Sequence, residues 1–460
     1  MSIYSWLFKK EIDKIEDSLK RTLGSDFYQA LLHNVQNRPV YMEDNIEAYI
    51  KYGYQYNPTV FSIISFITQK ASTIPWGVYE VKNEKALNLY KSASPNLSQF
   101  QKNIVKTKAM TAIEDHELNG LFMNPNVLQT WSEFIEQVIG FKLITGNGYI
   151  QCIGPTGGIN AGTISEMWNL PSPAVTIVAG DRFAPVKMYQ MLGHTDVNIP
   201  PEQMIHLKYW TPAYANGLFL YGMSPIQAAR RVVTKSNASY DSMVASFQNM
   251  GAVGIISPKD SVEELTPEQQ VAMEDLIERK TGPNRRGKPL VSGTPLQWQQ
   301  IGMSPADLAI IESDKMDLRT LCSVYHVSSE LFNDSANKTH ANMKEAGSSA
   351  YTNAVIPALN QLKEAINQKI HRSPQYKNIY VDYDTSMISE LQEDLQAMTT
   401  SLTGAWWITP NERRDIMNFG ADDKNPLMDD YWVSPGLMPM NGSMIDDAAI
   451  EAAAKMLDIK

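Results

Sequence analysis

The sequence predicts an α+β fold in which two long helices flank a small α/β insert. Apolar residues recur at spacings of three and four across residues 224–250, which is the period of an amphipathic helix, and a similar pattern covers 304–324. The segment between them, 251–303, reads as strands around a shorter helix. Strand-like segments separated by glycine-rich turns occupy much of residues 1–223, so this part is predicted to mix helices and sheets.

Composition and charge exclude several classes of protein. The 460 residues and 43% apolar content are those of an ordinary soluble chain with a large core. The longest apolar run, FSIISFI at 61–67, is far shorter than the roughly 20 residues of a membrane span. The first twenty residues carry charges where an export signal needs an apolar run. We therefore expect no membrane association and no export.

No pattern typical of a metal, cofactor or disulfide site is found. Cys152 and Cys322 are far apart and form no CxxC, and the histidines form no HExxH pair. The glycine-rich stretch 146–162 lacks the GK[ST] ending of a phosphate-binding loop, so we predict a hairpin turn there. The net charge of −10 argues against a conventional DNA-binding protein, which gains affinity from Lys and Arg.

Five short motifs mark helix starts. In each, a Ser or Thr caps the free N–H groups of the first turn and an acidic or amide side chain can fold back three residues later; four also place Pro at the first helical position. The motifs are TWSE at 130–133, SPIQ at 224–227, TPEQ at 266–269, SPAD at 304–307 and TPNE at 409–412.

The remaining elements follow from local patterns. Residues 57–80 read as a helix ending near STIPW and then a strand, whereas the polar residues 82–125 form an insertion without predicted structure. A helix over 341–371 carries Pro357 in its middle, which removes a backbone hydrogen bond and predicts a kink. Further strands are predicted at 141–154, 174–180, 186–192, 204–210 and 378–384.

The stretch LFNDSANKTHANMKEAG, residues 331–347, brings together the side-chain types of a hydrolase. Asp334, Ser335 and His340 could serve as acid, nucleophile and base, but no GxSxG turn is present and nothing places Ser335 beside His340. A polar loop is the alternative interpretation.

One local basic cluster could contact an acidic partner or simply be solvated surface; it consists of Arg279, Lys280, Arg285, Arg286 and Lys288.

An ordered series of fragments resembles the portal proteins of tailed bacteriophages. It runs from about residue 57 to 415 and includes NPTVFSIISFITQKASTIPWGVYEV, LITGNGYI, WNLPSPAVTIV, MIHLKYW, GMSPIQAAR, KPLVSGTPLQWQQIGMSPADLAIIES, YHVSSELF and ITPNERRDIM. Each fragment is weak alone, and the order carries the resemblance. Many relatives have Pro-Pro where Ser328 and Ser329 stand here, and Leu-Pro-Pro after the TPNE helix where this chain has GADDKNP, so the resemblance does not fix the loop boundaries at these two points.

The resemblance implies a division of the chain into the parts of a portal subunit. The helices at 224–250 and 304–324 would form the stem and 251–303 the clip, with the basic cluster as its motor-docking surface. Residues 1–223 and 325–385 would form the wing, spanned by the kinked helix 341–371, and 386–460 the crown and tail. A tunnel loop at 332–343 would line the DNA channel with Asn333, Asp334, Ser335, Asn337, Lys338, Thr339, His340 and Asn342.

The resemblance also implies a function that is not enzymatic. Portal subunits form a ring, usually of about twelve copies, at one capsid vertex, through which double-stranded DNA passes without sequence preference. The implied partners are other copies, a terminase motor, a head–tail adaptor, and the major capsid and scaffold proteins; the implied location is the virion, after assembly in the host cytoplasm. Two alternatives remain: a cytoplasmic hydrolase using Asp334, Ser335 and His340, and another structural protein of a virion or gene-transfer particle.

Overall fold

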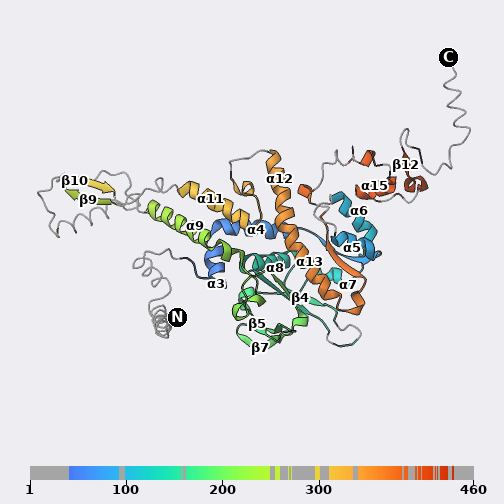
Figure 1. Cartoon of the computed structure of the whole chain (residues 1–460), viewed down its shortest axis with the longest axis horizontal. Helices are drawn as coiled ribbons and strands as arrows, with labels where there is room; N and C mark the ends of the chain where they lie inside the picture. The colour runs from blue at the N-terminus through green and yellow to red at the C-terminus, as the bar shows by residue number, and fades with distance from the viewer. Residues whose placement is uncertain are drawn as a thin grey trace, which may run out of the picture.

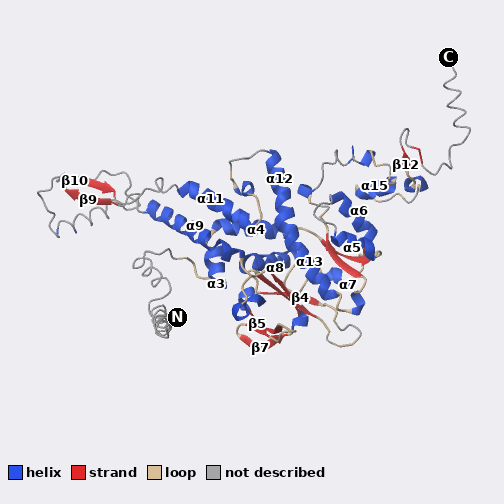
Figure 2. Ribbon diagram, in the orientation of Figure 1, coloured by secondary structure: helices blue, strands red, loops and turns tan. Residues whose placement is uncertain are grey.

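The computed structural model places helices around small antiparallel sheets (Figures 1 and 2). The described residues are 41–92, 99–155, 157–158, 162–248, 254–258, 268, 271, 296–300, 310–334, 340–385, 388–391, 399–400, 402–405, 407–417, 420, 422, 425–433 and 438–439. The α+β class predicted from the sequence is confirmed. Within these residues, no helix combines the length and apolar character needed to cross a membrane.

The β structure of the described residues consists of three sheets of three antiparallel strands and two two-stranded ribbons. The sheets have the strand orders β11-β1-β2, β4-β3-β8 and β5-β6-β7. The strands are β1 Trp76–Val81, β2 Met110–Ala112, β3 Asn147–Ile153, β4 Glu166–Leu170, β5 Val175–Ala179, β6 Val186–Met191, β7 His194–Ile199, β8 Met204–Lys208, β9 Gly254–Pro258, β10 Leu296–Gln300, β11 Ile379–Tyr383, β12 Trp432–Val433 and β13 Met438–Pro439.

The main core forms where helices α4 (Pro58–Ser72) and α8 (Trp131–Thr145) pack together. Asn57 caps α4 through Val60 N, and Thr130 and Glu133 form the predicted capping box of α8. Other helical segments are α3 Ile46–Ala48, η1 Tyr49–Gln55, α7 Glu117–Leu121, η2 Ser172–Ala174, η3 Pro201–Gln203, η4 Ala215–Leu220, η9 Pro374–Tyr376, η10 Ser389–Leu391 and η11 Pro426–Asp429.

The strand predicted over 141–154 is wrong at its start. Residues 141–145 form the last turn of α8, and β3 begins only at Asn147. Gly146 ends the helix with a φ of 82°, and a Cβ at this position would lie 2.6 Å from the Met223 backbone. The apolar letters FKLIT suit a buried helix and a buried strand equally well. The hairpin predicted across the following glycine-rich stretch is confirmed by the pairing of β3 with β4.

Three further features complete the fold: the polar insertion, the long helix and the helix opened by the TPNE motif. The polar insertion contains α5 (Glu84–Ser92) and α6 (Gln99–Ala109), which contact each other and pack beside the β11-β1-β2 sheet. The long helix predicted over 341–371 consists of α12 (His340–Ala350), the π-helical segment η8 (Tyr351–Val355) and α13 (Ile356–Ile370). The TPNE motif opens α15 (Pro410–Ile416) with the predicted exchange between Thr409 and Glu412.

Candidate functional site

Helices α9 (Pro225–Gln248) and α11 (Ile310–Val324) lie side by side and extend away from the body of the molecule (Figure 1). Lys235 on α9 joins them, because its Nζ lies 2.6 Å from Asp317 Oδ1 and donates to Ser313 Oγ at 3.0 Å. The paired strands β9 and β10 lie beyond the outer ends of the two helices. The sequence-predicted arrangement of two helices bracketing a small insert therefore holds for the described part of this region.

The chain turns sharply after α11. His326 and Asn333 both adopt positive φ angles, 58° and 66°, in the left-handed region that non-glycine residues seldom occupy. Between them lies the short helix η6 (Ser329–Phe332), and Val327 N donates to Cys322 O at 3.0 Å. This compact turn leads directly into the predicted tunnel loop.

An ion pair fixes the first part of that loop. Arg319 on α11 donates from Nε to Asp334 Oδ2 at 2.6 Å and from Nη2 to Asp334 Oδ1 at 3.0 Å, and Ser329 Oγ donates to Oδ2 at 2.9 Å. The Asp334 side chain is 6% exposed, whereas that of Arg319 is 50% exposed. In the single chain this carboxylate is buried and held by the guanidinium fork, and the role of Asp334 in lining a channel stays a prediction.

The other predicted loop residues are only partly within the described residues. Asn333 is exposed and Asn342 half-buried, and His340 is the first residue of α12. Ser335, Asn337, Lys338 and Thr339 lie outside the described residues, so their roles stay predictions. Asp334 forms an ion pair with Arg319, and the hydrolase hypothesis, which also needs Ser335, stays untested.

Two other predicted sites differ in how far the structure describes them. The basic cluster Arg279, Lys280, Arg285, Arg286 and Lys288 lies outside the described residues.

Pro357 is the second residue of α13, directly after the π-helical segment. Proline cannot donate to the preceding turn and its ring crowds the carbonyl four residues earlier, so a widened turn before Pro357 accommodates it. Its predicted role in setting the kink remains a prediction.

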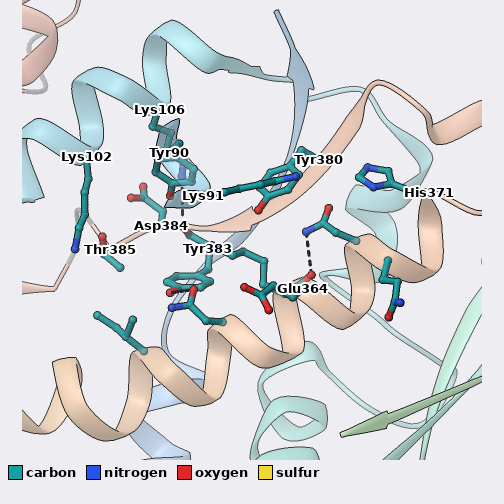
Figure 3. A pocket seen from close by; sticks show the side chains of 15 residues that line it. Tyr90, Lys91, Lys102, Lys106, Glu364, His371, Tyr380, Tyr383, Asp384 and Thr385 are labelled. Carbon is teal, nitrogen blue, oxygen red and sulfur yellow. Dashed lines mark hydrogen bonds between the residues drawn. The ribbon is translucent and has the colours of Figure 1, made fainter. Parts of the chain in front are cut away.

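A charged cavity that the sequence did not predict lies between the insertion and α13 (Figure 3). It has a volume of about 430 Å³. The buried carboxylate of Asp382 on β11 lies beside it, 3.0 Å from Lys106 Nζ and 3.1 Å from Lys363 Nζ, and it accepts a hydrogen bond from Tyr90 Oη at 2.7 Å. Burial alone would raise the pKa of the Asp382 carboxyl, but the two ammonium groups hold it below its usual value. The cluster fastens the insertion to the core.

The described residues offer little for catalysis or metal binding. No group of three His, Cys, Asp or Glu side chains within them could hold a metal ion. Burial raises the pKa of the Cys152 and Cys322 thiols to about 12, so both are protonated at neutral pH and poor nucleophiles.

Arg319 and Asp382 were not predicted from the sequence, for different reasons. Arg319 precedes Asp334 by 15 residues, and no local pattern links them. Asp382 did leave a signal, because it is an acidic residue inside the otherwise apolar strand IYVDY, all of whose residues are buried. An acid in that position needs a buried cationic partner.

Comparisons with known proteins assign the family. The model of the family described as phage portal protein matches residues 58–418. Uncharacterised proteins of Rickettsia bellii (strain RML369-C) and Rickettsia felis (strain ATCC VR-1525 / URRWXCal2) are 26% and 25% identical, each over 79% of this chain and 86% of the relative.

Solved structures show the same fold. A chain from the neck of an empty gene transfer agent particle is similar with a TM-score of 0.59 and 22% identity, over 84% of this chain and 96% of that one. A chain from the neck of the native particle, computed with C12 symmetry, has a TM-score of 0.57 and 21% identity over the same shares. Because the family model covers most of the sequence, including both long helices and the loop between α11 and α12, the chain belongs to the phage portal protein family.

Proposed function

We propose that copies of this chain close into a ring, of about twelve subunits, that forms the DNA channel at one vertex of a capsid. The observation that carries the proposal is the match of the phage portal protein family over residues 58–418. The similar chain from a gene transfer agent neck belongs to a structure computed with C12 symmetry, which supports the proposed subunit number.

Each part of the proposed portal subunit corresponds to particular elements of the structure. Helices α9 and α11 would be the stem, with β9 and β10 in the clip at its outer end, where the terminase motor and the head–tail adaptor would dock in turn. The sheets around α4 and α8, together with α13, would form the wing, and residues 386–460 the crown and tail. The major capsid and scaffold proteins would surround the ring in the virion, after its assembly in the host cytoplasm.

The charge arrangement near the proposed channel supports sliding of DNA. A protein that makes six to ten phosphate contacts loses roughly 10³–10⁵ in affinity over a modest range of salt, which shows how firmly fixed cations hold DNA. Arg319 is such a cation, but Asp334 neutralises it in every subunit. The proposed lining then consists mainly of neutral polar side chains, which exchange water-mediated contacts with passing phosphates.

The proposed activity is that of a conduit and requires no catalytic residue. Purified protein examined by native mass spectrometry and negative-stain electron microscopy tests it. We expect rings of about twelve copies with a central hole. A chain that stays monomeric or dimeric at all salt concentrations, or a particle without a central hole, would refute the proposal.

The carrier particle is either a phage virion or a gene-transfer particle. The similarity to chains of gene transfer agent necks favours testing the second candidate directly. Sequencing the DNA inside particles that contain this protein distinguishes them: a single repeated genome indicates a phage, and random host fragments indicate gene transfer.

A further inference from the structure

A second cavity lies where the proposed wing, stem and long helix meet. Its volume is about 460 Å³, and it is lined by the end of α8, the start of α9, the turn after α11, the π-helical turn and α13. Leu143, Tyr325 and Ala358 are among its apolar lining residues. A molecule held here would contact all three parts of the subunit at once.

One charged side chain of the lining lacks a counter-charge. Lys142, on the apolar face of α8, is 2% exposed, and its Nζ donates to Gln361 Oε1 and lies 4.5 Å from the centre of the Tyr209 ring. No carboxylate of the described residues forms an ion pair with it. Burial lowers the pKa of the Lys142 ammonium to about 8. A buried ammonium whose partners are one amide and one ring is costly, because charges in protein interiors are normally paired.

The rim of the cavity carries an exposed aromatic side chain. Trp210 also lines the cavity and is 81% exposed, and Tyr214, four residues later, is 79% exposed. Tryptophan and tyrosine are enriched in the centres of protein interfaces, where they supply apolar area and a polar group together. An exposed Trp beside a buried, unpaired cation favours a protein occupant over a free anion.

We propose that the cavity around Lys142 receives a carboxylate side chain from a second copy of this chain, and that Trp210 packs against that copy. This inference rests on the proposed ring, in which each subunit meets a neighbour through two different surfaces. The incoming carboxylate completes the ion pair that a single chain leaves unfinished. The contact also holds α13 against the start of α9, so subunit association fixes the wing relative to the stem.

Cross-linking of assembled rings tests the contact directly. Rings are formed from a mixture of ¹⁴N- and ¹⁵N-labelled chains and treated with a water-soluble carbodiimide, which joins an amine to an adjacent carboxylate. We expect the peptide that contains Lys142 to be linked to an Asp or Glu peptide of the opposite label, and the link to be absent from monomers. A link found only within one chain, or to a different protein, would overturn the inference.

A substitution provides an independent measure. Lys142→Met keeps the length of the side chain without its charge, and we expect the ring fraction at a fixed concentration to fall about tenfold, the effect of losing one contact of ordinary strength. Lys187→Met on the exposed face of β6 is the matched control and should leave the ring fraction unchanged. Circular dichroism of the monomer checks that both variants fold.

The outcomes separate this inference from the proposed function. If wild-type protein forms no ring, the proposed function fails and the inference fails with it. If wild-type rings form, yet Lys142 gives no link between chains and Lys142→Met assembles normally, only the inference is overturned.

Discussion

Helix α13 joins two regions that bury a lysine in opposite ways. Lys363 on α13 is 8% exposed and lies 3.1 Å from the Asp382 carboxylate. Gln361, two residues earlier on the same helix, instead accepts a hydrogen bond from Lys142, which is 2% exposed and has no carboxylate partner among the described residues. Positions two apart face different sides of a helix, so one side carries a completed charge cluster and another an incomplete one.

The pKa values of Lys106 and Lys142 differ because only Lys106 has a carboxylate beside it. Burial alone would lower the pKa of Lys106, the second cation of the Asp382 cluster, but the adjacent carboxylate raises it above the usual value. At Lys142 no adjacent carboxylate offsets the effect of burial, so the pKa of its ammonium is lowered to about 8. Breaking the completed cluster would leave buried charges unpaired, whereas Lys142 is already unpaired by any carboxylate of the described residues and is proposed to gain one from a second copy.

The largest expected effect comes from breaking the completed cluster. Asp382→Asn leaves Lys106 and Lys363 buried without a counter-charge, and we expect the free energy of unfolding to fall by roughly 3–5 kcal/mol. Urea denaturation of the monomer measures it. Asp181→Asn, in the exposed loop after β5, is the control. A loss below about 1 kcal/mol would mean that water reaches the cluster.

A third basic side chain, the half-buried His206, avoids an unpaired charge by staying neutral. Burial, with a smaller contribution from Lys208, lowers the pKa of His206 to about 3, and its Nε2 lies 3.0 Å from Asn147 Oδ1. Since the unfolded chain takes up a proton near pH 6.5, stability present above that pH is lost as the pH falls toward 3, by roughly 1.4 kcal/mol per pH unit.

His206→Gln should flatten this slope in denaturation series measured from pH 7 to 4.5. Its difference from wild type should reach roughly 2–3 kcal/mol at the lower end. His326→Gln is a control, because His326 lies in the turn after α11 and is exposed. Parallel pH dependence in wild type and His206→Gln would contradict the assignment.

Removing the charge of Lys142 is expected to stabilise the monomer. Lys142→Met removes the unpaired ammonium, so we expect the monomer to become more stable by roughly 1–2 kcal/mol at pH 7. In wild type, the folded chain releases this proton at about pH 8 and the unfolded chain near 10.5, so stability rises with pH between these values. The variant should lack that rise in thermal denaturation at pH 7 and pH 10. A destabilised variant would show that the cation contributes to the fold of a single chain.

Local chemistry explains which parts of the fold were predictable. The capping boxes at Thr130 and Thr409 formed as predicted, because each involves residues only three positions apart. The helices of the polar insertion were missed because α5 buries little beyond Leu87 and is stabilised by packing on distant residues. The wrong strand start at 141 has a similar cause, since an apolar run alone does not distinguish a helix from a strand.

The candidate site was predictable in position and not in chemistry. The polar stretch does follow α11 in the chain, and its role as a tunnel loop stays a prediction; the inward turn of Asp334 depends on Arg319, which lies on the helix before it. Lys142 had a readable signal, because it continues the apolar stripe of Phe134, Val138 and Ile139 at a position where a charge is unexpected. Its missing partner could be recognised only after the surrounding helices were placed.

The smallest effect on stability and the most specific effect on function are expected at the loop. Asp334→Asn releases Arg319, which is 50% exposed, so solvent screens most of the lost attraction and the folding stability should change least of the series. In the proposed ring, however, each subunit would then present an unpaired cation to the DNA. We expect slower packaging, measured as protected DNA per particle, with the defect shrinking as salt rises.

Arg319→Gln is the matched variant, because it breaks the same ion pair without exposing a cation. If the pair merely stabilises the loop, both variants slow packaging equally and neither depends on salt. If the pair neutralises the channel, only Asp334→Asn shows a salt-dependent defect, and the double variant Asp334→Asn with Arg319→Gln removes that dependence. A salt-dependent defect in Arg319→Gln as large as that in Asp334→Asn would contradict neutralisation, since Arg319→Gln removes the cation that the ion pair is proposed to neutralise.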